Sequence, residues 1–274
     1  ARLLLWAEQL EVLGAYQWGF RAGRSTTGAQ LVLQRLTEEA RAGAWPGEEV
    51  VAALLDLKSA YAKVVRVALW QLLARLGLPD QWLRVLQRMH DGVHYRVRVG
   101  AALADPYSPA RGLREGCPTS PVLFNLYMAA VMADFHSRRS AAALVSGRPL
   151  GLAWTCPGQA PPPWTHLQFA DDTTLLGPRR ELDGTEALPG ALQTFATTLD
   201  DWGGLENADK RQMVDLRSPA TASAVLLGRH VHGPSDQRAR GRQAEIVASG
   251  ALRLVRDIPT NPRQRWMVVS ALAE

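Results

Sequence analysis

An uninterrupted apolar run at residues 50–55, VVAALL, constrains the fold of this chain more than any other feature. Its length and its β-branched residues are typical of a strand that is buried on both faces, because a half-exposed strand alternates apolar and polar residues. The run ends in Asp56, an acid that follows an otherwise apolar segment. The sequence therefore predicts a buried strand that presents a carboxylate at the edge of a sheet.

Helical patterns lie on both sides of this strand in the sequence. Apolar residues recur at helical spacing over about residues 26–41, 64–76 and 81–89, and a glycine and a proline at 77 and 79 separate the last two segments. Ser120 followed by Pro121 predicts another helix start, with the serine hydroxyl accepting a hydrogen bond from a free backbone amide. We expect these helices to cover a sheet.

Two further segments have strand character. VHYRVRVG at residues 93–100 alternates apolar and polar residues, as a half-exposed strand does. HLQFADDTTLL at residues 166–176 consists of two short apolar runs around a polar centre, which predicts a hairpin with Asp171 and Asp172 at its tip. The order of elements predicts an α+β fold with helices on one face of the sheet.

Composition excludes several classes of protein. Of the 274 residues, 47% are hydrophobic, which suits a packed core. No apolar stretch reaches the ~18 to 20 residues of a membrane span. Cys117 and Cys156 are too few for a disulfide framework or a zinc site. We therefore expect an intracellular protein with no membrane partner.

The positive charge of the chain is concentrated toward its C-terminal end. The net charge is +5, and residues 206–274 hold eleven Lys and Arg against seven Asp and Glu. This distribution is compatible with a polyanionic partner, although charge alone is a weak indicator. We also expect the chain to be a piece of a longer protein.

Three acids are candidates for a metal site. Asp171 and Asp172 are adjacent carboxylates next to apolar strands, an arrangement that is costly unless a cation neutralises it. Together with Asp56 they form an all-oxygen donor set, which favours Mg²⁺ or Mn²⁺ over zinc and points to phosphoryl transfer by two metal ions. Such acids are also common as caps and turn residues, so spacing and charge leave both interpretations open.

Five segments carry a family resemblance. They are QWGFRAGRST (17–26), LDLKSAYAKV (55–64), GLREGCPTSPVLFNLYM (112–128), LQFADD (167–172) and GLENADKRQM (204–213). In order and spacing they resemble the reverse transcriptase domain of non-LTR (LINE-type) retrotransposons, which is related to the reverse transcriptases of group II introns. The resemblance covers about residues 17–230.

The resemblance implies an architecture and a metal content. It implies a right-hand polymerase with partial fingers at residues 1–50, a palm at 51–230 and the start of a helical thumb at 231–274. The palm would be an antiparallel sheet with helices on one face and with inserted fingers and palm helices. It also implies that Asp56, Asp171 and Asp172 hold two Mg²⁺ or Mn²⁺ ions.

Five residues correspond to the family's deoxynucleotide site. The resemblance places the backbone of Leu57 and Lys58 against the incoming triphosphate. Tyr61 matches the aromatic residue that closes the sugar pocket, where its ring would exclude a ribose 2′-hydroxyl. Glu115 and Gly116 belong to the loop beside the nucleotide, and Glu115 replaces the family's usual Gln.

The remaining candidates concern catalysis and nucleic acid. Lys210 matches a lysine near the triphosphate that can act as general acid to the pyrophosphate. Arg21 and Arg24 are expected in the fingers, near template or phosphate. Pro118 and Ser120 match positions under the nascent base pair and the template strand. For Lys210 and both arginines, a solvated surface side chain is the alternative interpretation.

These correspondences predict an RNA-directed DNA polymerase. Its partners would be an RNA template with a DNA primer, deoxynucleotides, and further domains such as an endonuclease in a larger polyprotein. A eukaryotic retroelement would place it in the nucleus. Two alternatives remain open: a decayed or domesticated relic that binds nucleic acid without polymerising, favoured by Glu115, and a protein similar to a group II intron maturase. Ala62 is a second departure, since many relatives carry Asp there.

Overall fold

The computed structural model describes residues 2–146, 151–152, 163–184, 189–217, 225–226 and 229–230. The thumb predicted at 231–274 lies outside these described residues. No helix in the described part of the chain is both long and apolar enough to cross a membrane. The helices are α1 (Arg2–Gln9), α2 (Thr26–Arg41), α3 (Ala60–Lys63), α4 (Arg66–Arg75), α5 (Asp80–His90), α6 (Ser120–Ser146), α7 (Arg179–Asp183), α8 (Ala191–Asp201) and the 3₁₀ helix η1 (Ala208–Lys210). The strands are β1 (Val50–Leu55), β2 (Arg98–Val99), β3 (Ala102–Leu103), β4 (His166–Phe169), β5 (Asp172–Pro178), β6 (Gln212–Asp215), β7 (Val225–Leu226) and β8 (Arg229–His230).

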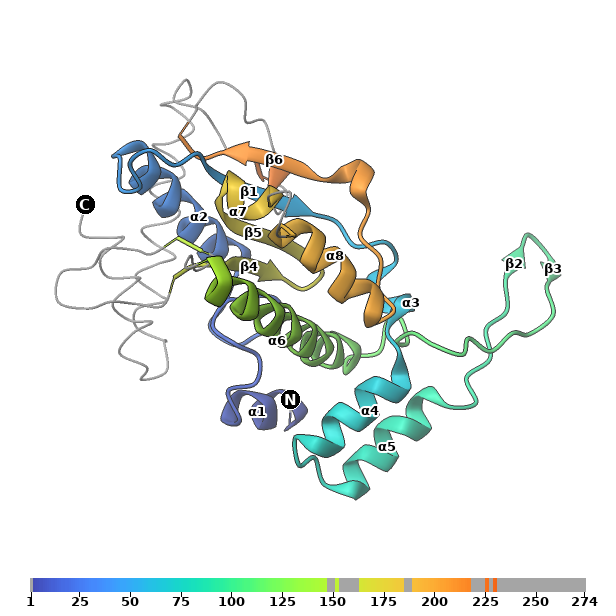
Figure 1. Cartoon of the computed structure of the whole chain (residues 1–274). Coiled ribbons are helices and arrows are strands. Elements are labelled where there is room, and N and C mark those ends of the chain that lie inside the picture. Colours follow the sequence, from blue (N-terminus) through green and yellow to red (C-terminus); the bar gives the residue numbers. More distant parts are fainter. Residues whose placement is uncertain are drawn as a thin grey trace. The chain divides into compact units, whose positions relative to one another are not determined.

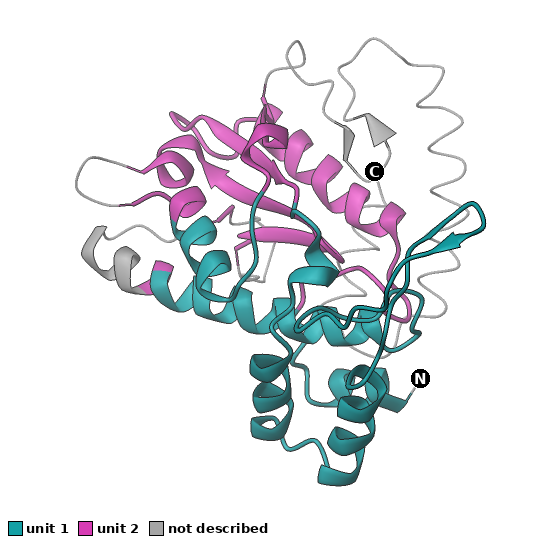
Figure 2. Cartoon of the chain, turned by 90° about the vertical axis from the view of Figure 1, so that its right-hand side faces the viewer, with its two compact units in different colours: residues 1–14, 57–138, 194–206 teal, residues 15–56, 139–193, 207–274 magenta. Residues whose placement is uncertain are grey.

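The chain forms two compact units that alternate along the sequence (Figure 2). The helical unit comprises residues 1–14, 57–138 and 194–206, and the sheet unit comprises residues 15–56, 139–193 and 207–274. The expected boundaries of fingers, palm and thumb at residues 50 and 230 do not coincide with these units. The division into fingers, palm and thumb therefore stays a prediction.

The sheet unit is built on a four-stranded antiparallel sheet with the strand order β4-β5-β1-β6 (Figure 1). β1 pairs with β5 from Val50 opposite Pro178 to Leu55 opposite Thr173, and its other edge pairs with β6. β4 and β5 form the predicted hairpin. The α+β class with an antiparallel sheet is confirmed, whereas β6 was not predicted.

Strand β1 is buried along its whole length, as its apolar run predicts. One face of the sheet packs against α2 in a hydrophobic core. Alternate residues of β1, which point to the opposite face, are buried as well, so the strand is enclosed on both faces. This enclosure fixes the end of β1, where Asp56 stands. The main core residues are Val32, Leu33, Leu36, Val50, Ala52, Leu54, Leu167, Leu176 and Val214.

Helix α2 matches its predicted range. Its N-cap is Ser25, whose hydroxyl accepts a hydrogen bond from the amide of Gly28 at 3.1 Å. A capping serine satisfies one of the amides that a helix leaves unpaired at its start. The QWGF segment therefore leads directly into a well-defined helix.

In the helical unit, α4 and α5 form a pair of helices separated by Gly77 and Pro79, as predicted. The alternating segment 93–100 forms only the two-residue strand β2, which pairs with β3 in a ribbon. Every side chain from Arg96 to Ser108 is exposed. A two-stranded ribbon with no covering layer lacks the burial that supports a longer strand.

Candidate active site

Asp56 follows β1 directly, at the end of the central pair of strands. Its carboxylate Oδ2 accepts a hydrogen bond from the side-chain amide of Asn207 at 3.2 Å, and its backbone carbonyl accepts one from the amide of Asn207 at 2.8 Å. The ammonium group of Lys210 lies 3.3 Å from the same Oδ2. Asp56 and Lys210 therefore form an ion pair, and a role of Lys210 at the triphosphate stays a prediction.

Asp171 and Asp172 lie at the turn between β4 and β5. Phe169 pairs with Asp172, which leaves Ala170 and Asp171 as a two-residue loop. Ala170 has a φ of 56°, the left-handed conformation that fits a tight hairpin turn. Asp171 is thus in the loop as predicted, whereas Asp172 is the first residue of β5.

The register of the sheet brings Asp172 toward Asp56. Leu55 is the last residue of β1 and stands opposite Thr173 of β5. Asp56 and Asp172 are the next residues in this antiparallel register, where side chains of facing residues are neighbours. Partial burial raises the pKa of Asp172, and the negative charges of Asp171 and Asp56 raise it further. The three predicted acids therefore share one electrostatic environment.

The donor set suits a hard cation, although the residues are not arranged as a finished metal site. Within the described ranges, no group of three or more His, Cys, Asp or Glu residues is placed so that it could hold a metal ion. The neighbouring negative charges that raise the pKa of Asp172 nevertheless favour the binding of a cation between the acids. The ammonium group of Lys210 partly neutralises this negative charge at Asp56.

The residues expected at the nucleotide belong to the helical unit. Leu57 is buried and Lys58 is exposed, and the amide of Lys58 donates to the carbonyl of Leu205 at 2.8 Å. The ring of Tyr61 stacks on Phe124 with 4.5 Å between centroids. The aromatic contact holds the Tyr61 ring in a defined position.

The loop before α6 packs tightly against the segment that contains Tyr61. The amides of Gly112 and Leu113 donate to the carbonyls of Val64 and Tyr61, each at 2.8 Å. A Cβ on Gly112 would lie 2.7 Å from the carbonyl oxygen of Ala62. This position therefore requires glycine.

The rest of the loop is largely open to solvent. Glu115, Gly116 and Pro118 are exposed, whereas Ser120 is buried. The Ser120 hydroxyl donates to the carbonyl of Arg114 at 2.6 Å, and its predicted acceptor role at the helix start stays a prediction. The serine closes the loop because the Arg114 carbonyl is within its reach.

Arg21 and Arg24 are engaged within the sheet unit. Both guanidinium groups donate to the carbonyl of Gln17, at 3.1 Å and 2.8 Å, and Arg24 also lies over the ring of Trp18. These contacts fasten the QWGF segment. A role of these arginines in binding phosphate stays a prediction.

Comparison with known proteins identifies the family. Residues 2–234 match the family described as "Reverse transcriptase (RNA-dependent DNA polymerase)". This chain belongs to the reverse transcriptase family. The predicted resemblance to non-LTR retrotransposons is confirmed by relatives of that kind.

The reverse transcriptase relatives are much longer than this chain. A Pol polyprotein of the type-1 retrotransposable element R2 from Nasonia vitripennis is 30% identical over 240 residues, which are 79% of this chain and 21% of that polyprotein. The corresponding type-2 element R2DM of Drosophila melanogaster is 27% identical over 64% of this chain and 15% of its own length. The chain thus spans about one fifth of these curated relatives or less.

Solved telomerase structures share the fold. One from Candida albicans has a TM-score of 0.54 and 14% identity, covering 91% of this chain and 42% of the telomerase. One from Candida tropicalis has a TM-score of 0.53 and 12% identity, covering 99% of this chain and 44% of the telomerase. At this level of identity the likeness supports the reverse transcriptase fold alone.

Two residues of this reverse transcriptase site were missed by the sequence analysis. Asn207 holds Asp56, and Gln17 is hydrogen-bonded to Ala170 in the aspartate turn. Both lie inside the five segments that carry the family resemblance, and that position was the only feature of the sequence that could have pointed to them. Their roles depend on partners about 150 positions away, which no local pattern indicates.

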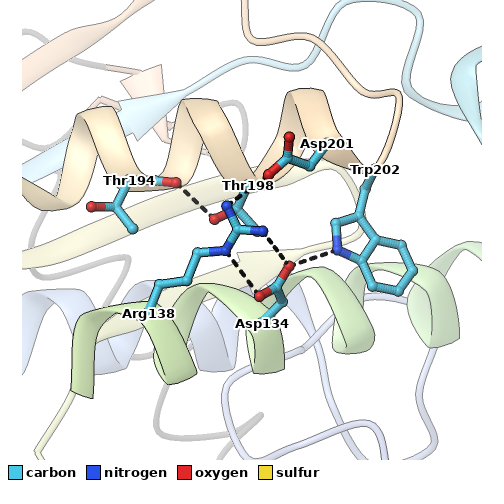
Figure 3. A network of polar contacts seen from close by, with 6 residues as sticks. All are labelled: Asp134, Arg138, Thr194, Thr198, Asp201 and Trp202. Atoms are coloured by element: carbon cyan, nitrogen blue, oxygen red, sulfur yellow. Dashed lines mark hydrogen bonds and ion pairs between the residues drawn. The ribbon is translucent and has the colours of Figure 1, made fainter. Parts of the chain in front are cut away.

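A polar network in the helical unit anchors the loop that leads to Asn207 (Figure 3). Arg138 binds both carboxylate oxygens of Asp134 at 3.0 Å and one of Asp201 at 2.7 Å. The indole of Trp202 donates to Asp134 at 3.0 Å. The Tyr127 hydroxyl donates to the Trp202 carbonyl. The network thereby secures the first residue of the loop at residues 202–206.

Proposed function

We propose that this chain is the catalytic core of an RNA-directed DNA polymerase, which transfers deoxynucleotides to a primer 3′-hydroxyl on an RNA template. The observation that carries the proposal is the convergence of Asp56, Asp171 and Asp172 at adjoining strand ends. The family supports the reaction class. The R2 relatives support an origin in a larger polyprotein, which would act in the nucleus of a eukaryotic host.

In this proposal the three acids hold two Mg²⁺ or Mn²⁺ ions. Bound ions would supply activation of the primer hydroxyl and neutralisation of the pyrophosphate. Asn207 would keep the Asp56 carboxylate oriented through its hydrogen bond to Oδ2. Lys210, whose ammonium group now lies beside Asp56, would turn to the triphosphate and donate a proton to the leaving pyrophosphate.

Tyr61 would select the nucleotide. Tyr61 is held by its stacking on Phe124, and a fixed ring can exclude a ribose 2′-hydroxyl. The backbone of Leu57 and Lys58 would lie along the triphosphate, with Glu115 and Gly116 beside it. Arg21, Arg24, Pro118 and Ser120 would face the template and primer.

Primer extension tests this function. With Mg²⁺, poly(rA) and an oligo(dT) primer, we expect the chain to incorporate dTTP. We expect Asp171→Asn to abolish incorporation, because it removes a ligand charge with little change in shape. The matched control is Asp200→Asn, which changes an exposed acid on α8. Equal incorporation by the two variants would reject the metal-site assignment.

One observation favours a second candidate, a nucleic-acid-binding relic that does not polymerise. Glu115 is exposed in the loop expected at the nucleotide, where its charge opposes that of the triphosphate. A relic would bind the primer-template in a gel-shift assay and fail to extend it. Recovery of extension by Glu115→Gln would assign the loss to that charge.

A further inference from the structure

The QWGF segment lies directly beside the hairpin that carries Asp171 and Asp172. Residues 16–18 pair with β4 in parallel: the amide of Trp18 donates to the carbonyl of Gln168 at 2.8 Å, and the amide of Gln168 donates to the carbonyl of Tyr16 at 2.9 Å. Gln17 and Gln168 thereby form an isolated parallel bridge beside β4, while the sheet itself keeps four strands. The bridge places the side chain of Gln17 at the aspartate turn.

The carboxamide of Gln17 makes three hydrogen bonds there. Its Oε1 accepts from the amide of Gly19 at 2.8 Å and from the amide of Ala170 at 2.9 Å. Its Nε2 donates to the carbonyl of Ala170 at 3.3 Å. Both polar groups of Ala170 are therefore bound by one side chain, and that side chain is only 3% exposed.

The conformation of Ala170 explains why such support is needed. A non-glycine residue with positive φ is strained and persists only where its surroundings fix it. Ala170 has a φ of 56° and immediately precedes Asp171. If Ala170 relaxed to negative φ, the tight turn would open and both aspartates would change direction.

Glutamine is well suited to this position. It accepts and donates hydrogen bonds without charge, whereas a glutamate would add a third negative charge beside two aspartates, and lysine or arginine offers no acceptor. Gly19 completes the fit, because a Cβ there would lie 2.4 Å from the amide nitrogen of Ala170. The segment and the turn are complementary in both shape and polarity.

We propose that Gln17 is a positioning residue of the polymerase site, whose carboxamide holds Ala170 in its left-handed conformation and thereby aims Asp171 and Asp172 at the metal ions. The expected effect of Gln17 on catalysis rests on the proposed polymerase function. Its structural part, the clamp on Ala170, can be tested without any catalysis.

Gln17→Met tests the clamp, because methionine has nearly the same shape and lacks all three hydrogen bonds. The first readout is hydrogen–deuterium exchange of the Ala170 amide, which we expect to become at least about tenfold faster. The matched control is Tyr16→Phe, which removes a hydrogen bond from the Tyr16 hydroxyl to the carbonyl of Pro163, made by the same segment away from the turn. Unchanged exchange in Gln17→Met would overturn the clamp.

The second readout is steady-state primer extension. For Gln17→Met we expect kcat to fall by about 10- to 100-fold, because small displacements of reacting groups have effects of that size. The KM for dTTP should stay within about twofold, since Gln17 is not expected to bind the nucleotide. The Mg²⁺ concentration for half-maximal rate should rise, whereas Tyr16→Phe should leave it unchanged. A normal kcat and Mg²⁺ requirement in Gln17→Met would overturn the positioning role.

Gly19→Ala provides a second variant in case Gln17→Met fails to fold. It keeps glutamine at position 17 and adds a Cβ that would lie 2.4 Å from the amide nitrogen of Ala170 and 3.1 Å from Oε1 of Gln17. We expect the same rise in Mg²⁺ requirement, and its absence would contradict the proposal. A wild-type chain that does not extend primers would reject the proposed function alone, because the exchange measurement still decides whether Gln17 clamps the turn.

Discussion

Two neighbouring arginines of α6 provide a sharp test of how burial sets the strength of an ion pair. Arg139 lies 3.3 Å from Glu181, and their side chains are 7% and 13% exposed. Arg138 lies 2.7 Å from Asp201, with side chains that are 37% and 53% exposed. The shorter contact is the more exposed one. Distance alone would therefore rank the Arg138–Asp201 pair as the stronger, whereas burial ranks the Arg139–Glu181 pair as the stronger.

Glu181→Ala should destabilise the fold far more than Asp201→Ala. Without Glu181, the guanidinium group of Arg139 stays buried, and among the described residues the carbonyl of Pro189, at 2.8 Å, remains as its hydrogen-bond acceptor. Removing one partner of a buried ion pair costs about 3 to 5 kcal/mol of stability. Because both side chains of this pair keep some contact with solvent, we expect a cost at the lower end, about 3 kcal/mol. The pair that Asp201 forms is exposed to solvent and screened by water, so its loss should change the free energy of unfolding far less.

Urea unfolding, followed by tryptophan fluorescence, measures both free energies of unfolding. The double variant Arg139→Met with Glu181→Leu should lose less stability than Glu181→Ala, because no buried charge remains unpaired. If Glu181→Ala cost no more than Asp201→Ala, the argument from burial would be refuted. The outcome also concerns the candidate site, since α7, which carries Glu181, directly follows β5.

Three further predictions test other parts of the structure. Hydrogen bonds from Arg138 hold the pKa of Asp134 below its ordinary value. The stability that the ionised Asp134 adds to the fold is therefore present above pH ~4 and is lost as the pH falls through the lowered folded-state pKa. The difference in free energy of unfolding between wild type and Asp134→Asn should shrink in that range, and a constant difference would exclude this linkage. Gly112→Ala adds a Cβ that would lie 2.7 Å from the Ala62 oxygen at a φ of +93° and should destabilise by about 2 kcal/mol or more in thermal melts; an unchanged melting temperature would contradict the tight packing. Tyr61→Ala should raise the ratio of ribonucleotide to deoxynucleotide incorporation by about tenfold, or ~1.4 kcal/mol, and an unchanged ratio would remove its role as a sugar gate.

Local sequence patterns predicted the elements that carry the acids. The apolar run before Asp56 became β1, and the two runs around Asp171 became the β4–β5 hairpin, because each pattern matches the burial that its own strand experiences. Helix α2 was predicted at its full range, since its residues have helical spacing. These features depend on short-range periodicity.

Long-range features were missed for a physical reason. Strand β6 has only four residues, and it forms by pairing with β1 about 160 positions earlier. Of the strand expected at 93–100 only Arg98–Val99 formed, because no described part of the chain covers the ribbon. Gln17 belongs to the QWGF segment, but only the fold shows that it lies against Ala170. Tertiary pairing decided all three cases.

The strand order also predicts that two parts of the candidate site differ in how readily they open: the end of the central strand β1, and the segment that precedes the edge strand β6. Asp56 follows β1, which is hydrogen-bonded to a strand on each edge, whereas Lys210 precedes β6, which has a described neighbour only at β1. Opening β1 would break two ladders, and opening β6 would break one, so edge amides should open more readily. The lysine can therefore leave its carboxylate while the carboxylate stays in place. Because the Lys210 side chain is 65% exposed, exchanging its ammonium group for another cation would need only a turn of that side chain, while β1 keeps Asp56 in place.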